Sequence, residues 1–234
     1  MQPWIGELIG TAILLFLGTA VVANVILKGT KGFGSGWIVI TAGWAMAVMI
    51  PAIIFGEISG SHFNPALTIG LAISGNFSWS YVPLYVVGQF IGAFIGGGLT
   101  WLFYRDHFNI TEDQGAQLGV FSTGPAIRNT VSNLISEFLG TFILVFTIMG
   151  LGNQPFAEGL NFFGVGGIIM AIGVSLGGTT GYAINPARDL GPRIAHFVFP
   201  MKNKGDSDWS YAWIPVVAPI AGAIVAALLA NAIF

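Results

Sequence analysis

The sequence predicts an all-α membrane protein in which six transmembrane helices and two re-entrant half-helices form an inverted repeat within one domain, residues 1–234. Three observations support this prediction. Hydrophobic residues make up 54% of the chain and charged residues only 8%, whereas soluble domains carry about 25% charged residues. Several apolar runs have the length of about 20 residues that a helix needs to cross a bilayer. The motif Asn-Pro-Ala interrupts the apolar sequence twice.

Six apolar segments predict the membrane spans. They are residues 4–27, 36–55, 81–103, 131–151, 161–179 and 211–233. Two further apolar runs follow the Asn-Pro-Ala motifs, one at 66–73 and one that ends at about residue 199, and each is only about half a membrane in length. Short apolar segments at corresponding places in two halves of a chain indicate a site at the membrane midplane built from discontinuous helices.

The two halves of the chain, about 1–110 and 130–234, match at an offset of 130 residues. The sequence ELIGT at 7–11 recurs as EFLGT at 137–141, and WSY at 79–81 recurs at 209–211. Each half contains three full spans, an odd number, so the second half enters the membrane from the opposite face. The two half-helices therefore meet start to start, which makes Asn64 and Asn185 neighbours although they are 121 residues apart.

Each copy of the motif predicts the start of a helix. Asn is a good N-cap because its side-chain oxygen accepts a hydrogen bond from a first-turn N–H, and Pro is favoured at the first helical position. With the oxygen used in this way, we expect the two N–H donors of each amide to face away from the helix. The copies are Asn64-Pro65-Ala66 and Asn185-Pro186-Ala187.

Several charged or titratable residues lie at membrane depth, where such residues are functional candidates. Arg188 directly follows the second motif and could bind hydroxyl oxygens, snorkel to the interface or pair with Asp189. Glu7 and Glu137 are related by the repeat, and we interpret them as acceptors for irregular backbone beside the half-helices rather than as a proton relay. His62 could relay protons, but we favour a hydrogen-bonded structural or pore-wall role.

Composition excludes several classes of function. Eight Lys and Arg residues argue against nucleic-acid binding, and the absence of cysteine excludes disulfides and thiolate metal sites. Phosphate-binding loops, metal-ligand spacings and nucleophile–base patterns are missing from the sequence, so we expect no enzyme, no cofactor and no metal. The N-terminus lacks the basic region of a signal peptide, and the first apolar segment is therefore expected to remain as a span.

Loop charges predict an orientation. With the N-terminus inside, every loop Lys and Arg lies outside, and the positive-inside rule then places the N-terminus outside instead. These residues are Lys28, Lys31, Arg105, Arg128, Lys202 and Lys204.

The chain resembles the aquaporin (major intrinsic protein) family over nearly its whole length. The resemblance rests on the two Asn-Pro-Ala motifs, on Ser59-Gly60-x-His62 before the first and on the paired Glu-x-x-Gly-Thr sequences. Asp189 after Arg188 is typical of the glycerol-facilitator branch, the aquaglyceroporins. The resemblance implies a right-handed bundle, a pore in each subunit, a homotetramer and a multi-pass protein of the plasma membrane. It also implies cytoplasmic termini, and we prefer this orientation because a whole-chain match is more specific than a few loop charges.

The resemblance also assigns site residues. The narrowest point of the pore falls on Trp44, Gly173, Tyr182 and Arg188. Water-selective members typically have His at the Gly173 position, so Gly is expected to leave room for a carbon chain, and glycerol facilitators usually have Phe at the Tyr182 position. Independently of the resemblance, we assign Glu7, Glu137 and Asp189 to structural support. Backbone carbonyls expected to line the pore are those of Gly60, Ser61, His62, Phe63, Tyr182, Ala183 and Ile184.

We therefore expect a passive channel for glycerol and other small uncharged solutes, which also conducts water and excludes protons and ions. Its partners would be these solutes and the lipid bilayer. One alternative is a channel mainly for water, dihydroxyacetone, urea, hydrogen peroxide or undissociated lactic acid. A second is a proton-coupled secondary transporter, which would also use broken helices but would need a titrating group on the route. A closed, purely structural membrane protein is the third.

Overall fold

The computed structural model describes residues 1–157 and 159–234, and ten α-helices form within them. Five of the helices have the length and hydropathy of membrane spans, and α8 is a shorter apolar helix. The all-helical prediction is therefore confirmed. The helices are α1 (Pro3–Ile26), α2 (Trp37–Ser59), α3 (Pro65–Ile73), α4 (Val82–Phe103), α5 (Arg105–Ile110), α6 (Gln114–Phe121), α7 (Thr130–Gly152), α8 (Leu160–Leu176), α9 (Pro186–Val198) and α10 (Ile214–Ile233).

Three spans differ from their predicted bounds by three residues or more. Helix α10 begins at Ile214 rather than at residue 211. Helix α2 continues through Pro51 to Ser59, beyond the predicted end at residue 55, and it stops where Gly60 adopts a left-handed φ of 78°, a frequent helix terminator. Helix α8 ends at Leu176 rather than at residue 179, because the following segment turns toward the second Asn-Pro-Ala motif. The short helices α5 and α6, which follow α4, were not predicted.

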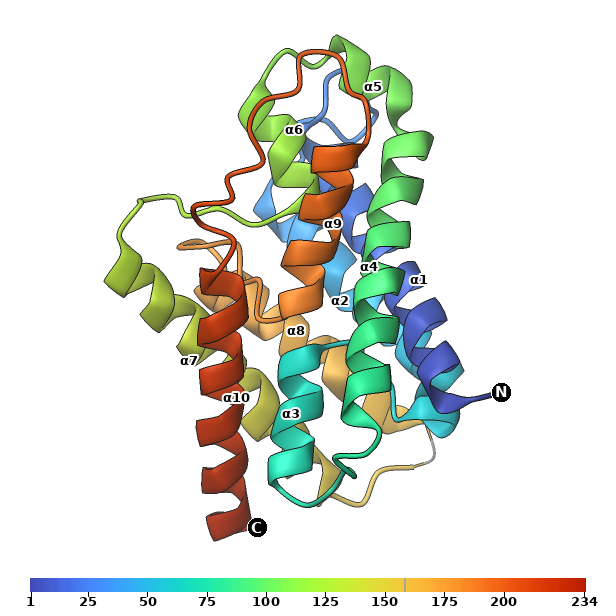
Figure 1. Ribbon diagram of the computed structural model, residues 1–234, viewed down its shortest axis with the longest axis vertical. Helices are drawn as coiled ribbons and strands as arrows, with labels where there is room; N and C mark the ends of the chain where they lie inside the picture. The colour runs from blue at the N-terminus through green and yellow to red at the C-terminus, as the bar shows by residue number, and fades with distance from the viewer. Residues whose placement is uncertain (158) are drawn as a thin grey trace.

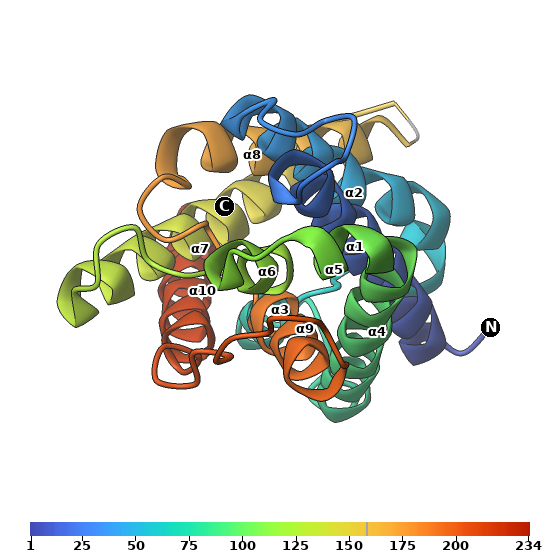
Figure 2. The same ribbon diagram turned by 90° about the horizontal axis from the view of Figure 1, so that it is seen from above.

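The half-helices α3 and α9 lie in the middle of the molecule with their starts facing each other (Figure 1). Viewed from above, they lie one over the other among the longer helices (Figure 2). Helix α3 contacts α10, and α9 contacts α4. Each half-helix therefore packs against the third long helix of the opposite half, which interlocks the two repeats.

The inverted repeat extends to close backbone packing. A Cβ atom on Gly92 of α4 would lie 2.2 Å from the carbonyl oxygen of Leu8 in α1. At the matching place, a Cβ on Gly222 of α10 would lie 2.3 Å from the carbonyl oxygen of Phe138 in α7. Glycine at these crossings lets the helix backbones come close together, as is common in membrane helices.

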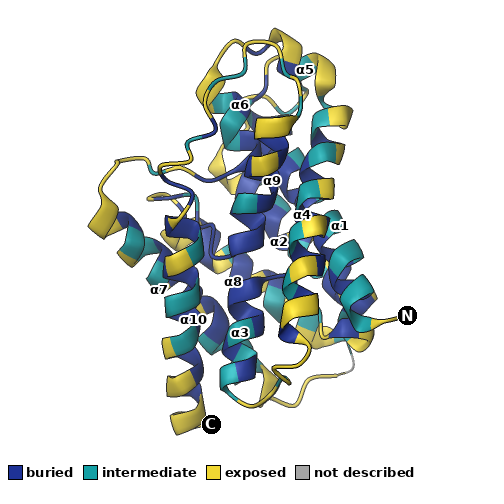
Figure 3. Cartoon of the chain, in the orientation of Figure 1, coloured by how far each residue is buried: buried dark blue, intermediate teal, exposed yellow. Residues whose placement is uncertain are grey.

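The burial pattern fits a surrounding bilayer. Buried residues concentrate where α3 and α9 meet, and exposed residues follow the outer faces of the long helices (Figure 3). Many of the exposed residues are large and apolar, such as Met46 and Ile54 on α2 and Leu228 on α10. A water-facing surface rarely carries extended apolar patches of this kind, so these faces are suited to lipid or to a neighbouring membrane protein.

Three connecting segments form one cap at the end of the molecule opposite the C-terminus (Figure 1). The backbone N–H of Lys28 donates to Thr111 Oγ1 at 3.0 Å, and His107 Nδ1 lies 3.0 Å from the Lys28 carbonyl oxygen. Gln117 Nε2 donates to the Lys202 carbonyl oxygen at 2.8 Å. The loops after α1 and α9 are thus joined to the linker that carries α5 and α6.

Candidate functional site

The site is built around the starts of α3 and α9, and both Asn side chains cap them as predicted. Asn64 Oδ1 accepts from the Ala66 N–H at 2.9 Å, and Asn185 Oδ1 accepts from the Ala187 N–H at 3.0 Å. Pro65 and Pro186 hold the first helical position. The helix-start interpretation of both motifs is confirmed.

The donors of the two amides are used differently from our expectation. Asn64 Nδ2 donates to the carbonyl oxygen of Ile184 at 2.8 Å, and Asn185 Nδ2 donates to that of Phe63 at 2.8 Å. One N–H of each amide therefore binds the opposite loop, and only the second remains for a passing solute. The same bonds engage the carbonyls of Phe63 and Ile184, which were expected to serve the pore.

The two loops before the half-helices have an unusual backbone. Ser61 and Phe63 have φ values of 52° and 48°, and Tyr182 and Ile184 have 41° and 45°. These pairs match at the 121-residue offset of the motifs. Left-handed backbone costs about 1–3 kcal/mol for a residue other than glycine and persists only where surrounding contacts impose it. Nothing in these residue types predicts it, and sequence reasoning missed it.

Glu7 supplies such contacts for the first loop. Its carboxylate accepts from the backbone N–H of His62 at 2.9 Å and of Phe63 at 2.6 Å. The Ser59 hydroxyl and the Gln89 amide also donate to it, each at 2.7 Å. All four of these hydrogen bonds come from the loop or from the residues that support it, and Glu7 has no exposed surface.

Glu137 holds the second loop in the corresponding way. It accepts from the N–H groups of Ala183 and Ile184 at 3.0 and 2.8 Å and from the Thr180 hydroxyl at 2.6 Å. The residue that matches Gln89 in this half is Pro219, which has no donor. Neither Glu7 nor Glu137 belongs to the cavity lining, so the geometry favours structural support over a proton relay for both.

A cavity of about 240 Å³ runs along the two loops. Its lining is mostly apolar, and it includes Trp44, Tyr182 and Arg188 together with both motif asparagines. The loop residues Gly60, Ser61, His62 and Ala183 line it as well.

His62 also belongs to a buried polar and aromatic cluster. Its Nδ1 lies 3.1 Å from Thr68 Oγ1, and its ring packs 4.7 Å from the Phe77 ring and 5.2 Å from the Tyr85 ring. Gln89 Nε2 donates to the same Thr68 oxygen at 2.9 Å. These contacts support the structural and pore-wall interpretation of His62.

Arg188 lines the cavity and packs against the ring of Trp44. Its guanidinium carbon lies 3.9 Å from the centroid of the Trp44 indole, a cation–π geometry, and its Nη1 donates to the Phe121 carbonyl oxygen at 3.2 Å. The suggested pairing of Arg188 with Asp189 does not form. Asp189 instead binds Arg193, whose Nε lies 2.8 Å away.

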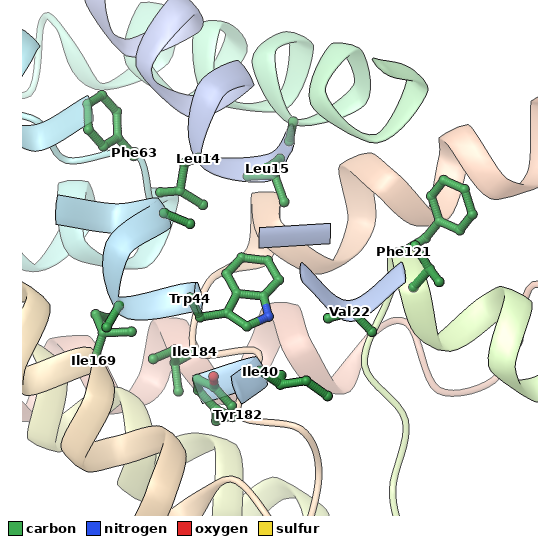
Figure 4. Packing of buried hydrophobic residues seen from close by; sticks show 14 of the residues in the cluster. Leu14, Leu15, Val22, Ile40, Trp44, Phe63, Phe121, Ile169, Tyr182 and Ile184 are labelled. Atoms are coloured by element: carbon green, nitrogen blue, oxygen red, sulfur yellow. The ribbon is translucent and has the colours of Figure 1, made fainter. Parts of the chain in front are cut away.

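Tyr182 occupies the space that Gly173 was expected to leave open. A Cβ on Gly173 would lie 2.9 Å from both Cζ and the hydroxyl oxygen of Tyr182, and Gly173 itself does not line the cavity. The Tyr182 hydroxyl is buried and has no hydrogen-bond partner among the described residues. Gly173 therefore receives an aromatic ring rather than a solute. Figure 4 shows Trp44 and Tyr182 within one apolar cluster, which also contains Ile40 and Ile184.

Arg193 and Thr123 were missed by sequence reasoning. Asp189 Oδ2 accepts from the N–H and the hydroxyl of Thr123 at 2.8 and 2.7 Å, and Arg193 donates to the carbonyl oxygens of Thr123 at 2.8 Å and Ser207 at 2.7 Å. The pair ties α9 to two outer loops. The spacing of Asp189 and Arg193, four residues on a helix, is a known signal for such a pair, whereas Thr123 carries no signal.

A second ion pair holds the outer loops together. Arg128 binds Asp208 and also reaches the Ser210 hydroxyl. Burial tends to raise the pKa of Asp208, but hydrogen bonds from Arg128 and Ser210 outweigh it and lower that pKa below its ordinary value. The carboxylate therefore stays ionised and paired at neutral pH.

Comparison with known proteins agrees with the resemblance read from the motifs. The family model described as "Major intrinsic protein" matches residues 1–230. The "Glycerol uptake facilitator protein" of Streptococcus pneumoniae (strain ATCC BAA-255 / R6) is 55% identical over 229 residues and 98% of each chain. The protein of the same name from Bacillus subtilis (strain 168) is 53% identical over 234 residues, 100% of this chain and 85% of that one.

A solved structure shares the fold. The aquaglyceroporin from Plasmodium falciparum superposes with a TM-score of 0.85 at 29% identity, covering 99% of this chain and 95% of that chain. A family match over nearly the full length, relatives more than half identical and a shared fold show that this chain belongs to the major intrinsic protein family.

Proposed function

We propose that the protein is a passive channel of the plasma membrane for glycerol and other small uncharged solutes, which also conducts water and excludes protons and ions. The observation that carries this proposal is the junction of the two half-helices, where Asn64 and Asn185 each keep one N–H beside the cavity. The names of the relatives from Streptococcus pneumoniae and Bacillus subtilis support glycerol as the solute.

Exclusion of cations follows from electrostatics. A helix N-terminus carries a partial positive charge of about half an elementary charge, and two of them face the cavity at the motif asparagines. Arg188 adds a full positive charge beside the same cavity. Fixed positive charge in a narrow pore raises the energy of protons and cations, while neutral solutes pass without this penalty.

Solute choice is proposed to depend on Trp44, Tyr182 and Arg188. The two rings provide an apolar wall for CH groups. Arg188 has five N–H donors, and within the described residues only Nη1 is bonded to protein, so donors remain for the hydroxyl groups of a polyol. A molecule with CH groups on one edge and hydroxyls on the other fits this division. Because the ring of Tyr182 fills the notch at Gly173, Gly173 is proposed to act through Tyr182 rather than by direct contact.

The geometry argues against a proton-coupled transporter. Such a transporter needs a titrating group on the solute route. Glu7 and Glu137 do not line the cavity, and their carboxylates accept from backbone N–H groups of the two loops. His62 lies in the lining, but its Nδ1 is engaged with Thr68.

Stopped-flow light scattering on proteoliposomes tests the function. We expect glycerol to enter faster than in protein-free liposomes, at a rate proportional to its gradient and without accompanying acidification. Equal rates with and without protein would contradict a glycerol channel. Accumulation against a gradient when a pH difference is imposed would instead support the transporter. Parallel runs with water, urea and dihydroxyacetone rank the alternative solutes.

The family resemblance supports two further proposals, a homotetramer and cytoplasmic termini. Two of the loop charges that argue for the opposite orientation, Lys204 and Arg128, form contacts within the protein. Lys204 Nζ donates to the carbonyl oxygens of Phe197 and Phe199 at 2.8 and 3.0 Å at the end of α9, and Arg128 binds Asp208. Native mass spectrometry tests the first proposal, and protease accessibility of a C-terminal tag in sealed vesicles tests the second.

A further inference from the structure

Trp37, the first residue of α2, contacts the constriction from outside the cavity. Its ring meets the Tyr182 ring edge to face, with centroids 5.9 Å apart and planes at 78°. Its indole Nε1 donates to the carbonyl oxygen of Gly173 in α8 at 2.9 Å. Trp37 is thus bonded to the same helix turn that receives Tyr182.

The Tyr182 ring packs against two surfaces. One is the C-terminal end of α8 with Gly177 directly after it. A Cβ on Gly177 would lie 2.4 Å from Tyr182 Cδ1, and a Cβ on Gly173 would lie 2.9 Å from its hydroxyl oxygen. The other is the Trp37 ring, whose Cζ2 would lie 2.8 Å from the same Gly177 Cβ position. The Tyr182 hydroxyl forms no bond among the described residues, so packing alone fixes this ring.

An ordinary role for a tryptophan at the end of a membrane-spanning helix is to anchor that helix at the membrane surface. Anchoring tryptophans lie at the headgroup level, where the indole N–H can bond to water or headgroups. Trp37 is 41% exposed, yet its indole N–H is directed inward to Gly173. That bond, together with the edge-to-face contact with Tyr182, indicates a structural role at the constriction in addition to anchoring.

We propose that Trp37 is a positioning residue that holds the Tyr182 ring against α8 and so sets the largest solute that the constriction admits. The proposal rests on the proposed function, because it concerns the selectivity of that channel. Without the Trp37 ring, the ring of Tyr182 gains space on the side of Trp37, which does not line the cavity. Its rotation into that space widens the cavity between Trp44, Tyr182 and Arg188.

Uptake of two polyols into proteoliposomes tests the proposal, with glycerol as the small solute and xylitol as the larger one. We expect Trp37→Ala to raise the ratio of xylitol to glycerol permeability by about two- to tenfold, the population change that corresponds to loss of one aromatic pair. Trp37→Phe keeps a ring but loses the N–H, and we expect a smaller increase. Trp213→Ala is the matched control, because Trp213 is similarly exposed, at 46%, and does not line the cavity.

A double-mutant cycle separates positioning from a general loss of structure. In a Tyr182→Ala background there is no ring to hold, so adding Trp37→Phe should leave the xylitol to glycerol ratio unchanged. A ratio unaffected by Trp37→Phe and Trp37→Ala in the wild-type background would overturn the proposal, as would an equal change in the Tyr182→Ala background. If the unmodified protein itself fails to conduct glycerol, the proposed function fails instead, and the two failures are distinguishable.

Discussion

Asn64 Nδ2 lies 2.8 Å from the carbonyl oxygen of Ile184, so the cap of one half-helix is bonded to the loop that precedes the other. The reciprocal bond runs from Asn185 to Phe63 at 2.8 Å. Each asparagine thus serves its own helix with its oxygen and the opposite repeat with its nitrogen. This relationship makes the junction a shared structure that neither half can form alone.

Replacing Asn64 by Ser separates these two tasks. Ser is as good an N-cap as Asn, but its short side chain does not span the distance to Ile184. We expect α3 to form and the protein to lose about 0.5–1.5 kcal/mol of stability, the net contribution of one hydrogen bond, with slower glycerol uptake. Thermal unfolding in detergent measures the first effect, and Asn76→Ser on the exposed loop after α3 is the control. An unfolding temperature equal to that of the unmodified protein would show that the bond contributes nothing.

Tyr182→Phe tests whether the hydroxyl meets the solute. The hydroxyl is buried beside Gly173 and has no hydrogen-bond partner among the described residues. Its removal therefore takes no hydrogen-bonding group away from the solute pathway. We expect glycerol permeability within about twofold of the unmodified protein, since no hydrogen bond is lost. Equal or greater thermal stability should accompany it. A fall in glycerol permeability with unchanged water permeability would instead place the hydroxyl on the solute route.

Gly173→Ala is expected to narrow the pore indirectly. The new Cβ would lie 2.9 Å from the Tyr182 hydroxyl and 2.8 Å from Thr41 Cγ2, and the Tyr182 ring must move away from α8. Overpacking of this kind costs about 1–3 kcal/mol, and the ring's free direction is the cavity. We expect glycerol permeability to fall more than water permeability, as measured by stopped-flow on the same liposomes. Adding Tyr182→Ala should restore glycerol flux, and failure of that rescue would contradict the mechanism.

The sequence was sufficient for the parts of the structure that have a local or periodic signal. Apolar runs gave the spans, and the capping chemistry of Asn64 and Asn185 gave the starts of α3 and α9. The 130-residue repeat offset and the odd number of spans in each half predicted the inverted repeat. The hydrogen-bond partners of the side chains were harder to predict, because these partners are distant in sequence. No local pattern shows that Asn64 donates to Ile184 or that Arg188 reaches Phe121.

Gly173 shows the same limit at the constriction. We interpreted the missing side chain of Gly173 as open space for a solute, but a neighbouring side chain can also fill the space beside a glycine. Here that neighbour is Tyr182, supported by Trp37. The left-handed backbone at Phe63 and Ile184 could not be predicted either, since those residue types disfavour it. The contacts that hold it come from residues distant in sequence, among them the carboxylates of Glu7 and Glu137.

The buried carboxylates therefore provide the sharpest test of how the loops are held. Glu7→Gln replaces one accepting oxygen by an NH₂ group. At the oxygen that binds Phe63 and Gln89, Gln89 could turn its own amide, because its Oε1 has no partner among the described residues. The Phe63 N–H cannot turn, and a buried donor without an acceptor costs about 1–3 kcal/mol. Glu137→Gln leaves the Ile184 N–H in the same position.

We accordingly expect Glu7→Gln and Glu137→Gln to lower the unfolding temperature by similar amounts. Glycerol uptake per folded channel should also fall, because the strained loops relax once their acceptor is weakened. Glu57→Gln, on the exposed surface of α2, removes the same charge without touching a loop and should leave both quantities unchanged. If Glu137→Gln were as stable and as active as Glu57→Gln, the strain at Ile184 would have to be held by the chain itself, and the carboxylate would be dispensable to the site.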